Sequence, residues 1–251
     1  MWKASAWDIF KSPSLAFEGI RTILQTDPIR SWFFSTLVVQ YSLSLEGWRA
    51  PFGTYYEFGV SSGGTLTKFA AALKSFCKYT KYDQSKYEIF AFDSFQGLPK
   101  STEQRDSHPS WKEGTFAATE EIALMEARKL CPKTKIRAIK GFFEKSLTDS
   151  LRKELARSPP SIINLDVDYY SSTKIALDWL EPIMPSGCLI YFDDIWSFFG
   201  NPNMGQLYAI QEFNNRGEGI LTPYSSIRQS ILIGKTFIYS RKNFEYKSND
   251  F

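Results

Sequence analysis

Short apolar runs alternate with longer segments of helical spacing through the middle of the chain, and this alternation restricts the possible folds more than any other feature. Strand-like runs occur at residues 54–60, 87–92, 135–139, 161–165 and 188–192. Helical patterns lie between them, at residues 65–76, 119–130, 147–156 and 172–183. Strands that alternate with helices of this length form parallel βαβ units with helices on both faces of the sheet. The chain is therefore predicted to form a doubly wound, Rossmann-like α/β fold in three layers.

The last part of the chain follows a different pattern. A helical segment at residues 204–215 precedes two strand-like runs, residues 219–226 and 230–240. These two runs are too close in sequence for a crossover helix, so they are expected to pair antiparallel. The sheet is thus predicted to be mostly parallel, with an antiparallel C-terminal strand and a hairpin-like edge.

The first fifty residues predict helices and no strands. Residues 13–25 have helical apolar spacing, and residues 29–45 follow Asp27 and Pro28, which suit a helix cap and first turn. The apolar run at residues 32–43 is too short to span a bilayer and contains polar side chains, which favours a buried helix. We expect a helical extension, residues 1–50, that packs on a core domain of residues 51–251.

Composition narrows the class of protein. Hydrophobic residues make up 43% of the chain and aromatic residues 16%, which is enough for a large core, and the net charge of +3 is too small to indicate a nucleic-acid partner. Cys77, Cys131 and Cys188 lie far apart without C-x-x-C spacing, which argues against a disulfide framework or a zinc site. We expect a cytoplasmic protein with neither nucleic-acid nor membrane partners.

Ligands of open α/β sheets bind beyond the carboxyl ends of the strands, so the residues at those ends are the candidates for function. The first strand-like run ends in EFGVSSGGT, where Glu57 and Gly59 precede Gly63, Gly64 and Thr65. This is G-x-x-x-G, not the G-x-G-x-x-G of dinucleotide-binding folds. An acid before the first glycine suits the amino end of a zwitterionic ligand better than a pyrophosphate. A plain glycine turn is the alternative.

The second and third strand ends also carry candidate ligand contacts. Asp93 ends the second run, where a carboxylate can accept hydrogen bonds from both ribose hydroxyls of a nucleoside. A turn or cap role is the alternative for Asp93. Gly141 makes the turn after the third run, and Phe142 or Phe143 is placed either to flank an adenine ring or to join the core.

Four aspartates follow the next two strands. Asp166 and Asp168 end the fourth run, and Asp193 and Asp194 end the fifth. Burying such carboxylates without partners costs several kcal/mol each, so they either face water as caps or surround a cation. Oxygen ligands with no histidine nearby indicate Mg²⁺, Mn²⁺ or Ca²⁺ in preference to Zn²⁺.

Together these segments resemble the macrocin O-methyltransferase family. The resemblance covers residues 54–240 and rests on EFGVSSGGT, DSFQGLP, KGFFEKSL, LDVDYYSST, PSGCLIYFDD and LYAIQEF. It implies a class I, S-adenosylmethionine-dependent methyltransferase, a homodimer, that uses Mg²⁺ or Mn²⁺ to methylate a hydroxyl of a sugar or glycosylated small molecule. A nearby carboxylate, Asp166 or Asp168, would take the proton. A metal site would be formed by Asp166, Asp193 and Asp194. The implied methyl-donor contacts are Glu57, Gly59, Ser61, Gly63, Thr65, Asp93, Ser94, Gly141, Phe142 and Asp166.

Aromatic and loop residues add candidates around this site. By the resemblance, residues 106–119 form a mobile lid over the cofactor, and this segment contains the lone histidine, His108. A lone loop histidine beside a proline is more often exposed than catalytic. Side chains that either line an acceptor pocket or join the core are Trp111, Tyr169, Tyr170, Trp196 and Phe198.

Three other functions account for part of the sequence. The D-x-D of Asp166 and Asp168 also fits a metal-dependent glycosyltransferase, but this leaves EFGVSSGGT and the second acidic strand end unexplained. A nicotinamide oxidoreductase needs a different glycine spacing. A catalytically silent methyltransferase-like binding protein would be expected to lose part of the acidic set, whereas Glu57, Asp93 and the strand-end aspartates are all present.

Overall fold

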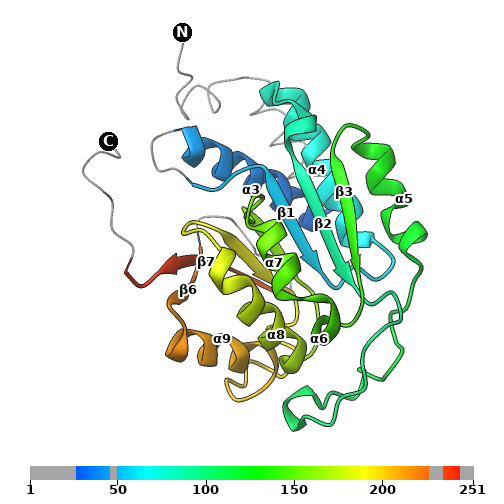
Figure 1. Cartoon of the computed structure of the whole chain (residues 1–251), viewed down its shortest axis with the longest axis vertical. Coiled ribbons are helices and arrows are strands. Elements are labelled where there is room, and N and C mark those ends of the chain that lie inside the picture. Colours follow the sequence, from blue (N-terminus) through cyan, green and yellow to red (C-terminus); the bar gives the residue numbers. More distant parts are fainter. Residues whose placement is uncertain (1–26, 46–49, 226–233, 244–251) are drawn as a thin grey trace.

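The computed structural model describes residues 27–45, 50–225 and 234–243, and its centre is one seven-stranded sheet (Figure 1). The strand order is β3-β2-β1-β4-β5-β7-β6. The strands are β1 (Thr54–Phe58), β2 (Glu88–Asp93), β3 (Lys135–Lys140), β4 (Ile162–Leu165), β5 (Leu189–Phe192), β6 (Gly219–Pro223) and β7 (Lys235–Arg241). The predicted helix at residues 13–25 lies outside the described residues.

Helices cover both faces of the sheet, which confirms the predicted three layers (Figure 1). The α-helices are α3 (Pro28–Leu45), α4 (Gly64–Thr80), α5 (Glu120–Leu130), α6 (Phe143–Ser146), α7 (Asp149–Leu155), α8 (Tyr170–Leu180) and α9 (Gly205–Arg216). Short 3-10 turns occur at Gln84–Lys86, Gln104–Asp106 and Glu181–Ile183. The helix predicted at residues 172–183 ends as an α-helix at Leu180 and continues as a 3-10 turn, because Pro182 has no backbone N–H to donate.

The pairing of the strands confirms a mostly parallel sheet. Strands β3, β2, β1, β4 and β5 pair parallel, whereas β7 pairs antiparallel with both β5 and β6. The predicted antiparallel pair is therefore present, with β7 placed between β5 and β6. The strand order reverses at β1, which lies between β2 and β4. The carboxyl ends of β1 and β4 therefore flank the crevice where such sheets bind ligands.

Two apolar clusters follow from the alternation of side chains along each strand. Tyr55 of β1 faces α3, α4 and α5, where its ring stacks on Phe69 with centroids 3.7 Å apart. The next residue, Tyr56, faces the cluster that includes α7, α8 and α9. Since successive strand residues point to opposite faces, five short strands supply both clusters.

The predicted buried helix at residues 32–43 lies within α3. Trp32, Phe33 and Leu37 are buried in the same cluster as Tyr55, and Gln40 donates hydrogen bonds to the carbonyls of Ser161 and Gly187 at 3.0 and 2.8 Å. In the ranges that the structure describes, no helix is both long and apolar enough to cross a bilayer. The apolar run thus forms part of the core and packs α3 against the sheet.

Truncating Phe33 is expected to show that α3 belongs to the core. Its ring is fully buried, 5.6 Å from the ring of Tyr55 and 5.1 Å from that of Phe69. Phe33→Ala should lower the free energy of unfolding by about 3–5 kcal/mol through lost burial and a cavity. Urea unfolding measures this. Leu45→Ala, at a 44% exposed side chain of the same helix, is the control and should stay close to wild type.

Candidate active site

A cleft of about 270 Å³ lies at the carboxyl edge of the sheet, beyond strands β1, β2 and β4. Most of the predicted donor contacts line it: Gly59, Ser61, Asp93, Ser94, Gly141, Phe142 and Asp166. Asp168, predicted as a base, lines it too. Lining residues that sequence reasoning did not assign are Gly97, Leu98, Pro99, Glu144, Val167 and Ser172. The cleft therefore gathers residues from segments far apart in the chain.

Gly59 permits the turn that ends β1 at Phe58, two residues before the predicted end. Its φ is +79°, and a Cβ at this position would lie 1.6 Å from the carbonyl oxygen of Asp166. Any side chain would therefore push the end of β1 away from the residue that follows β4. The glycine loop and Asp166 approach this closely only because residue 59 has no side chain.

Asp93 organises the loops around the cleft. One oxygen, Oδ2, accepts hydrogen bonds from the backbone N–H groups of Val60 and Ser61 at 2.7 and 2.9 Å. The other, Oδ1, accepts from the N–H of Phe95 at 2.6 Å. Asp93 is thus a turn residue, as one of the two interpretations predicted. A carboxylate has about four acceptor positions, so it retains capacity for a ligand in the cleft that it lines.

Three predicted donor contacts lie outside the cleft lining. Gly63 allows α4 to start against α5, because a Cβ there would lie 2.0 Å from the carbonyl oxygen of Ala123. Thr65 borders a small cavity of about 10 Å³ that Asp166 and Asp193 also border. Glu57 is fully buried beneath the glycine loop, on the face of β1 that carries Tyr55.

Glu57 is a buried acid with only part of its hydrogen-bonding capacity satisfied. Oε2 accepts a hydrogen bond from the hydroxyl of Tyr55 at 2.6 Å, whereas Oε1 has no partner in the part of the chain that is described. Burial and the negative charge of Asp93 raise the pKa of Glu57 to about 8, against the opposing effect of the Tyr55 hydrogen bond. In the free protein this carboxyl group is therefore largely protonated near neutral pH.

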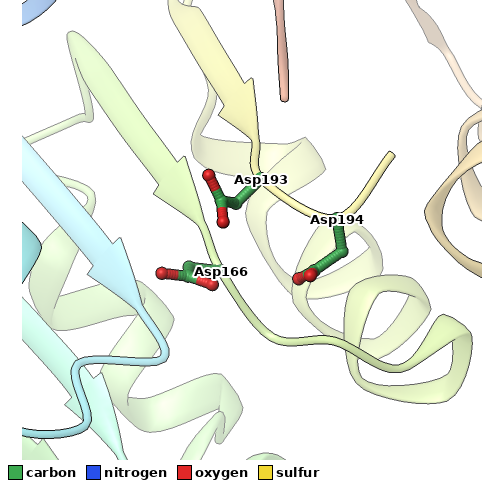
Figure 2. A group of neighbouring side chains, drawn as sticks. All are labelled: Asp166, Asp193 and Asp194. Atoms are coloured by element: carbon green, nitrogen blue, oxygen red, sulfur yellow. The ribbon is translucent and has the colours of Figure 1, made fainter. Parts of the chain in front are cut away.

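Asp166, Asp193 and Asp194 form a compact acidic cluster where β4 and β5 end (Figure 2). One carboxylate oxygen from each of the three lies within 4.8 Å of the others. Parallel pairing places Leu165 beside Phe192, so the residues that follow them emerge side by side. The predicted convergence of two acidic strand ends is present.

The electrostatics of the cluster favour a cation. Burial raises the pKa of Asp166, and the charges of Asp193 and Asp194 raise it further. The pKa of Asp194 is raised to about 8 by burial and then by Asp168 and Asp193. Among the ion pairs of the described residues, none involves these four aspartates. Crowded carboxylates with no basic partner match the oxygen ligands of Mg²⁺ or Mn²⁺.

Asp168 follows the cluster but faces the cleft. Its φ is +58°, and its backbone N–H donates to Oδ2 of Asp194 at 3.0 Å. Burial and the nearby charge of Asp193 together raise the pKa of the Asp168 carboxyl to about 6. Asp168 therefore bonds the cluster through its backbone and also lines the cleft.

Sequence reasoning missed Gln206, which is 1% exposed and supports the cluster from α9. Its Oε1 accepts from the N–H of Asp194 at 3.0 Å, and its Nε2 donates to the carbonyl of Leu165 at 3.1 Å. Gln206 directly precedes the LYAIQEF segment, and no local sequence pattern there predicts that its side chain is buried. A buried glutamine at the start of a helix is recognisable only once the packing is known.

The predicted lid segment, residues 106–119, borders the cleft through Phe116. Leu98 and Thr115 are joined by a backbone hydrogen bond of 2.9 Å, and Phe116 lines the cleft. Asp106, also missed from sequence, is buried and accepts 3.0 and 2.6 Å bonds from the N–H and hydroxyl of Ser171 at the start of α8. The location fits a lid, while its mobility stays a prediction.

His108 packs together with three of the candidate acceptor aromatics, Trp111, Tyr169 and Phe198. The ring of His108 lies 4.5 Å from that of Trp111, which in turn lies 5.4 Å from Phe198 and 5.9 Å from Tyr169. His108 does not line the cleft; it is half-buried and packs on aromatic rings, where the sequence favours an exposed histidine. Trp196 is 52% exposed. Tyr170 instead donates its hydroxyl hydrogen bond to Glu212 at 2.6 Å.

The sheet order, the glycine loop after β1 and the acid that ends β2 define a Rossmann-like fold with a ligand cleft at the carboxyl edge of the sheet. The model of the macrocin O-methyltransferase (TylF) family matches residues 50–230, and the chain belongs to this family. The resemblance seen in the sequence is thus confirmed.

Solved structures share the fold. The calicheamicin methyltransferase CalS11 superposes with a TM-score of 0.57 at 20% identity, over 84% of this chain and 79% of that one. The O-methyltransferase NovP gives a TM-score of 0.57 at 19% identity, over 84% and 81% of the two chains. No match was found among curated proteins.

Removing the titratable carboxyl group of Glu57 should change how the free energy of unfolding depends on pH. The folded state keeps this proton up to about pH 8, whereas the unfolded chain releases it near 4.5. The folded state thus binds more protons between these values, so stability falls as pH rises through that window, by at most about 1.4 kcal/mol per pH unit. Glu57→Gln should flatten this fall in denaturant unfolding from pH 5 to 8.

The control for this measurement is Glu126→Gln on the exposed surface of α5, which should preserve the wild-type slope. A Glu57→Gln protein with the same slope as wild type would show that the carboxyl group is ionised in the folded state despite its burial.

Proposed function

We propose that this protein is a divalent-metal-dependent O-methyltransferase that moves a methyl group from S-adenosylmethionine to a hydroxyl of a sugar or glycosylated small molecule. The observation that carries the proposal is the acidic cluster of Asp166, Asp193 and Asp194 beside a cleft that Asp166 also lines. The family supports transfer to oxygen. The expected homodimer and cytoplasmic location stay predictions.

The methyl donor would occupy the cleft between the glycine loop and the turn after β3. The backbone at Gly59 can approach the methionine part, and the free acceptor positions of Asp93 suit the ribose hydroxyls. Gly141 and Phe142 line the region assigned to adenine. Glu57 is buried beneath the loop and does not line the cleft, and the positive charge of the donor's amino group nearby would favour its ionised form.

The metal ion would be held by Asp166, Asp193 and Asp194. When bound, Mg²⁺ or Mn²⁺ stabilises the negative charge that develops on an acceptor oxygen and helps to orient that oxygen. The chain supplies the remaining work. Asp168 lines the cleft and lies outside the three-carboxylate cluster, which supports Asp168 as the base and Asp166 as the ligand. The walls of the cleft align donor and acceptor, which lowers the entropic part of the barrier.

The acceptor would approach from the side of the aromatic group. Trp111 packs on Phe198 and on Tyr169, the residue that follows Asp168, and apolar ring faces are suited to the C–H faces of a sugar or to its apolar substituent. Calorimetry with S-adenosylmethionine, with and without Mg²⁺, followed by labelled-methyl transfer to a panel of glycosides, tests the function. Donor binding without turnover on any acceptor would favour a catalytically silent binding protein.

Asp193→Asn should abolish metal-dependent turnover while leaving donor binding within about threefold of wild type. Loss of a direct ligand should cost more than the roughly 10–100-fold that loss of an outer partner costs. Initial rates over a Mg²⁺ titration, together with calorimetry of the donor, measure the two effects. Asp149→Asn, an exposed aspartate of α7, is the control. Full activity of Asp193→Asn would remove Asp193 from the metal site.

Asp93→Ala should weaken donor binding by about 1.5–3 kcal/mol, the range for a lost hydrogen bond to a charged group. The dissociation constant of S-adenosylhomocysteine, measured by calorimetry, should therefore rise by roughly one to two orders of magnitude. Far-UV circular dichroism checks that the loop changes have not unfolded the chain. An unchanged dissociation constant would leave Asp93 with its turn role alone.

A further inference from the structure

Gln206 joins the backbones of the two segments that carry the acidic cluster. Its side-chain amide bonds the carbonyl of Leu165, the residue before Asp166, and the N–H of Asp194. The paired ladder of β4 and β5 ends at Leu165 and Phe192, followed by one further bond from the N–H of Asp193 to the carbonyl of Leu165 at 3.2 Å. The glutamine amide thus continues the ladder for one more residue, across the point where the strands would otherwise separate.

An amide is the side-chain group that meets both requirements at this position. The N–H of Asp194 needs an acceptor, and the carbonyl of Leu165 takes a second donor. A neutral amide provides one acceptor and one donor within a rigid plane, without adding charge beside three carboxylates. An aliphatic residue of similar size would leave the N–H of Asp194 without this partner.

The start of α9 is built to place this amide. Gly205, the preceding residue, has a φ of +53°, and a Cβ there would lie 2.7 Å from the ring of Phe198. The helix start therefore packs closely on the loop that follows Asp194. The backbone N–H of Asp168 donates to the carboxylate of Asp194, so a displacement of Asp194 would also displace Asp168.

We infer that Gln206 is a positioning residue for the divalent cation: it holds the ends of β4 and β5 at the separation in which Asp166, Asp193 and Asp194 bind the ion together. The inference rests on the proposed metal-dependent function. Gln206 itself contributes no ligand, because both of its amide atoms are engaged with backbone. Partners that orient metal ligands typically change metal affinity by about 10–100-fold when they are removed.

The test is metal affinity measured without turnover. Calorimetric titration of the full chain with Mn²⁺, in saturating S-adenosylhomocysteine, should give a dissociation constant about 10–100-fold higher for Gln206→Met than for wild type. Affinity for S-adenosylhomocysteine should stay within threefold. Saturating S-adenosylhomocysteine also stabilises a weakened fold by mass action, so the titration is feasible in a less stable variant.

Asn214 provides a matched control on the same helix. Its side-chain amide also makes one bond of each kind, donating to the carbonyl of Leu221 at 3.0 Å and accepting from its N–H at 2.7 Å, but it holds β6. Asn214→Leu should lower stability without changing Mn²⁺ affinity. In turnover assays Gln206→Met should regain activity at saturating metal, whereas a merely structural loss would lower kcat at every metal concentration.

The outcomes separate the two ideas. Wild-type protein that binds no Mn²⁺ overturns the proposed metal site, and this inference with it. Wild-type binding with equal affinity in Gln206→Met overturns the positioning role alone, as does an equal loss of affinity in Asn214→Leu. A loss of Mn²⁺ affinity confined to Gln206→Met supports it.

Discussion

The close approach of like charges at the ends of β4 and β5 is the constraint on which the rest of the site depends. Oxygens of Asp166, Asp193 and Asp194 lie within 4.8 Å of one another, so repulsion and desolvation both oppose their ionised state. The fold tolerates this because its stability comes from elsewhere, namely from the apolar clusters on the two faces of the sheet. Parallel pairing and the Gln206 amide hold the backbones that carry these carboxylates side by side.

The same edge of the sheet contains strained backbone that carboxylates stabilise. Ser61, Phe95 and Asp168 have positive φ values of 47°, 56° and 58°. Such conformations cost about 1–3 kcal/mol each for residues other than glycine. In all three cases the backbone N–H donates to an aspartate, to Asp93 for the first two and to Asp194 for the third. The acids therefore shape the loops around the cleft, and Asp93 also lines the cleft, so a turn role and a binding role need not exclude one another at Asp93.

The strands and the convergence of the acids were predictable because both depend on short-range patterns. Apolar runs in the sequence mark the positions of β1 to β5. Because parallel strands end at the same edge of the sheet, the acids that follow the neighbouring strands β4 and β5 lie close together. Long-range partners had no such signal: Gln206 reaches Leu165 across 41 positions, and the placement of β7 between β5 and β6 depends on contacts between distant segments. The two-residue period places Glu57 on the same face of β1 as Tyr55, and its burial depends on the helices that cover that face.

The division of roles between Asp166 and Asp168 depends on a backbone turn. In an extended strand, residues two apart point to the same side, so both carboxylates would join the cluster and neither would be free to accept a proton. The left-handed conformation of Asp168 breaks that period, and the bond from its N–H to Asp194 holds the break in place. Asp166 stays among the three clustered acids while Asp168 turns to the cleft. Under the proposed function, the D-x-D motif would supply a ligand and a separate base because β4 ends at Leu165 and the chain is no longer a strand at either acid.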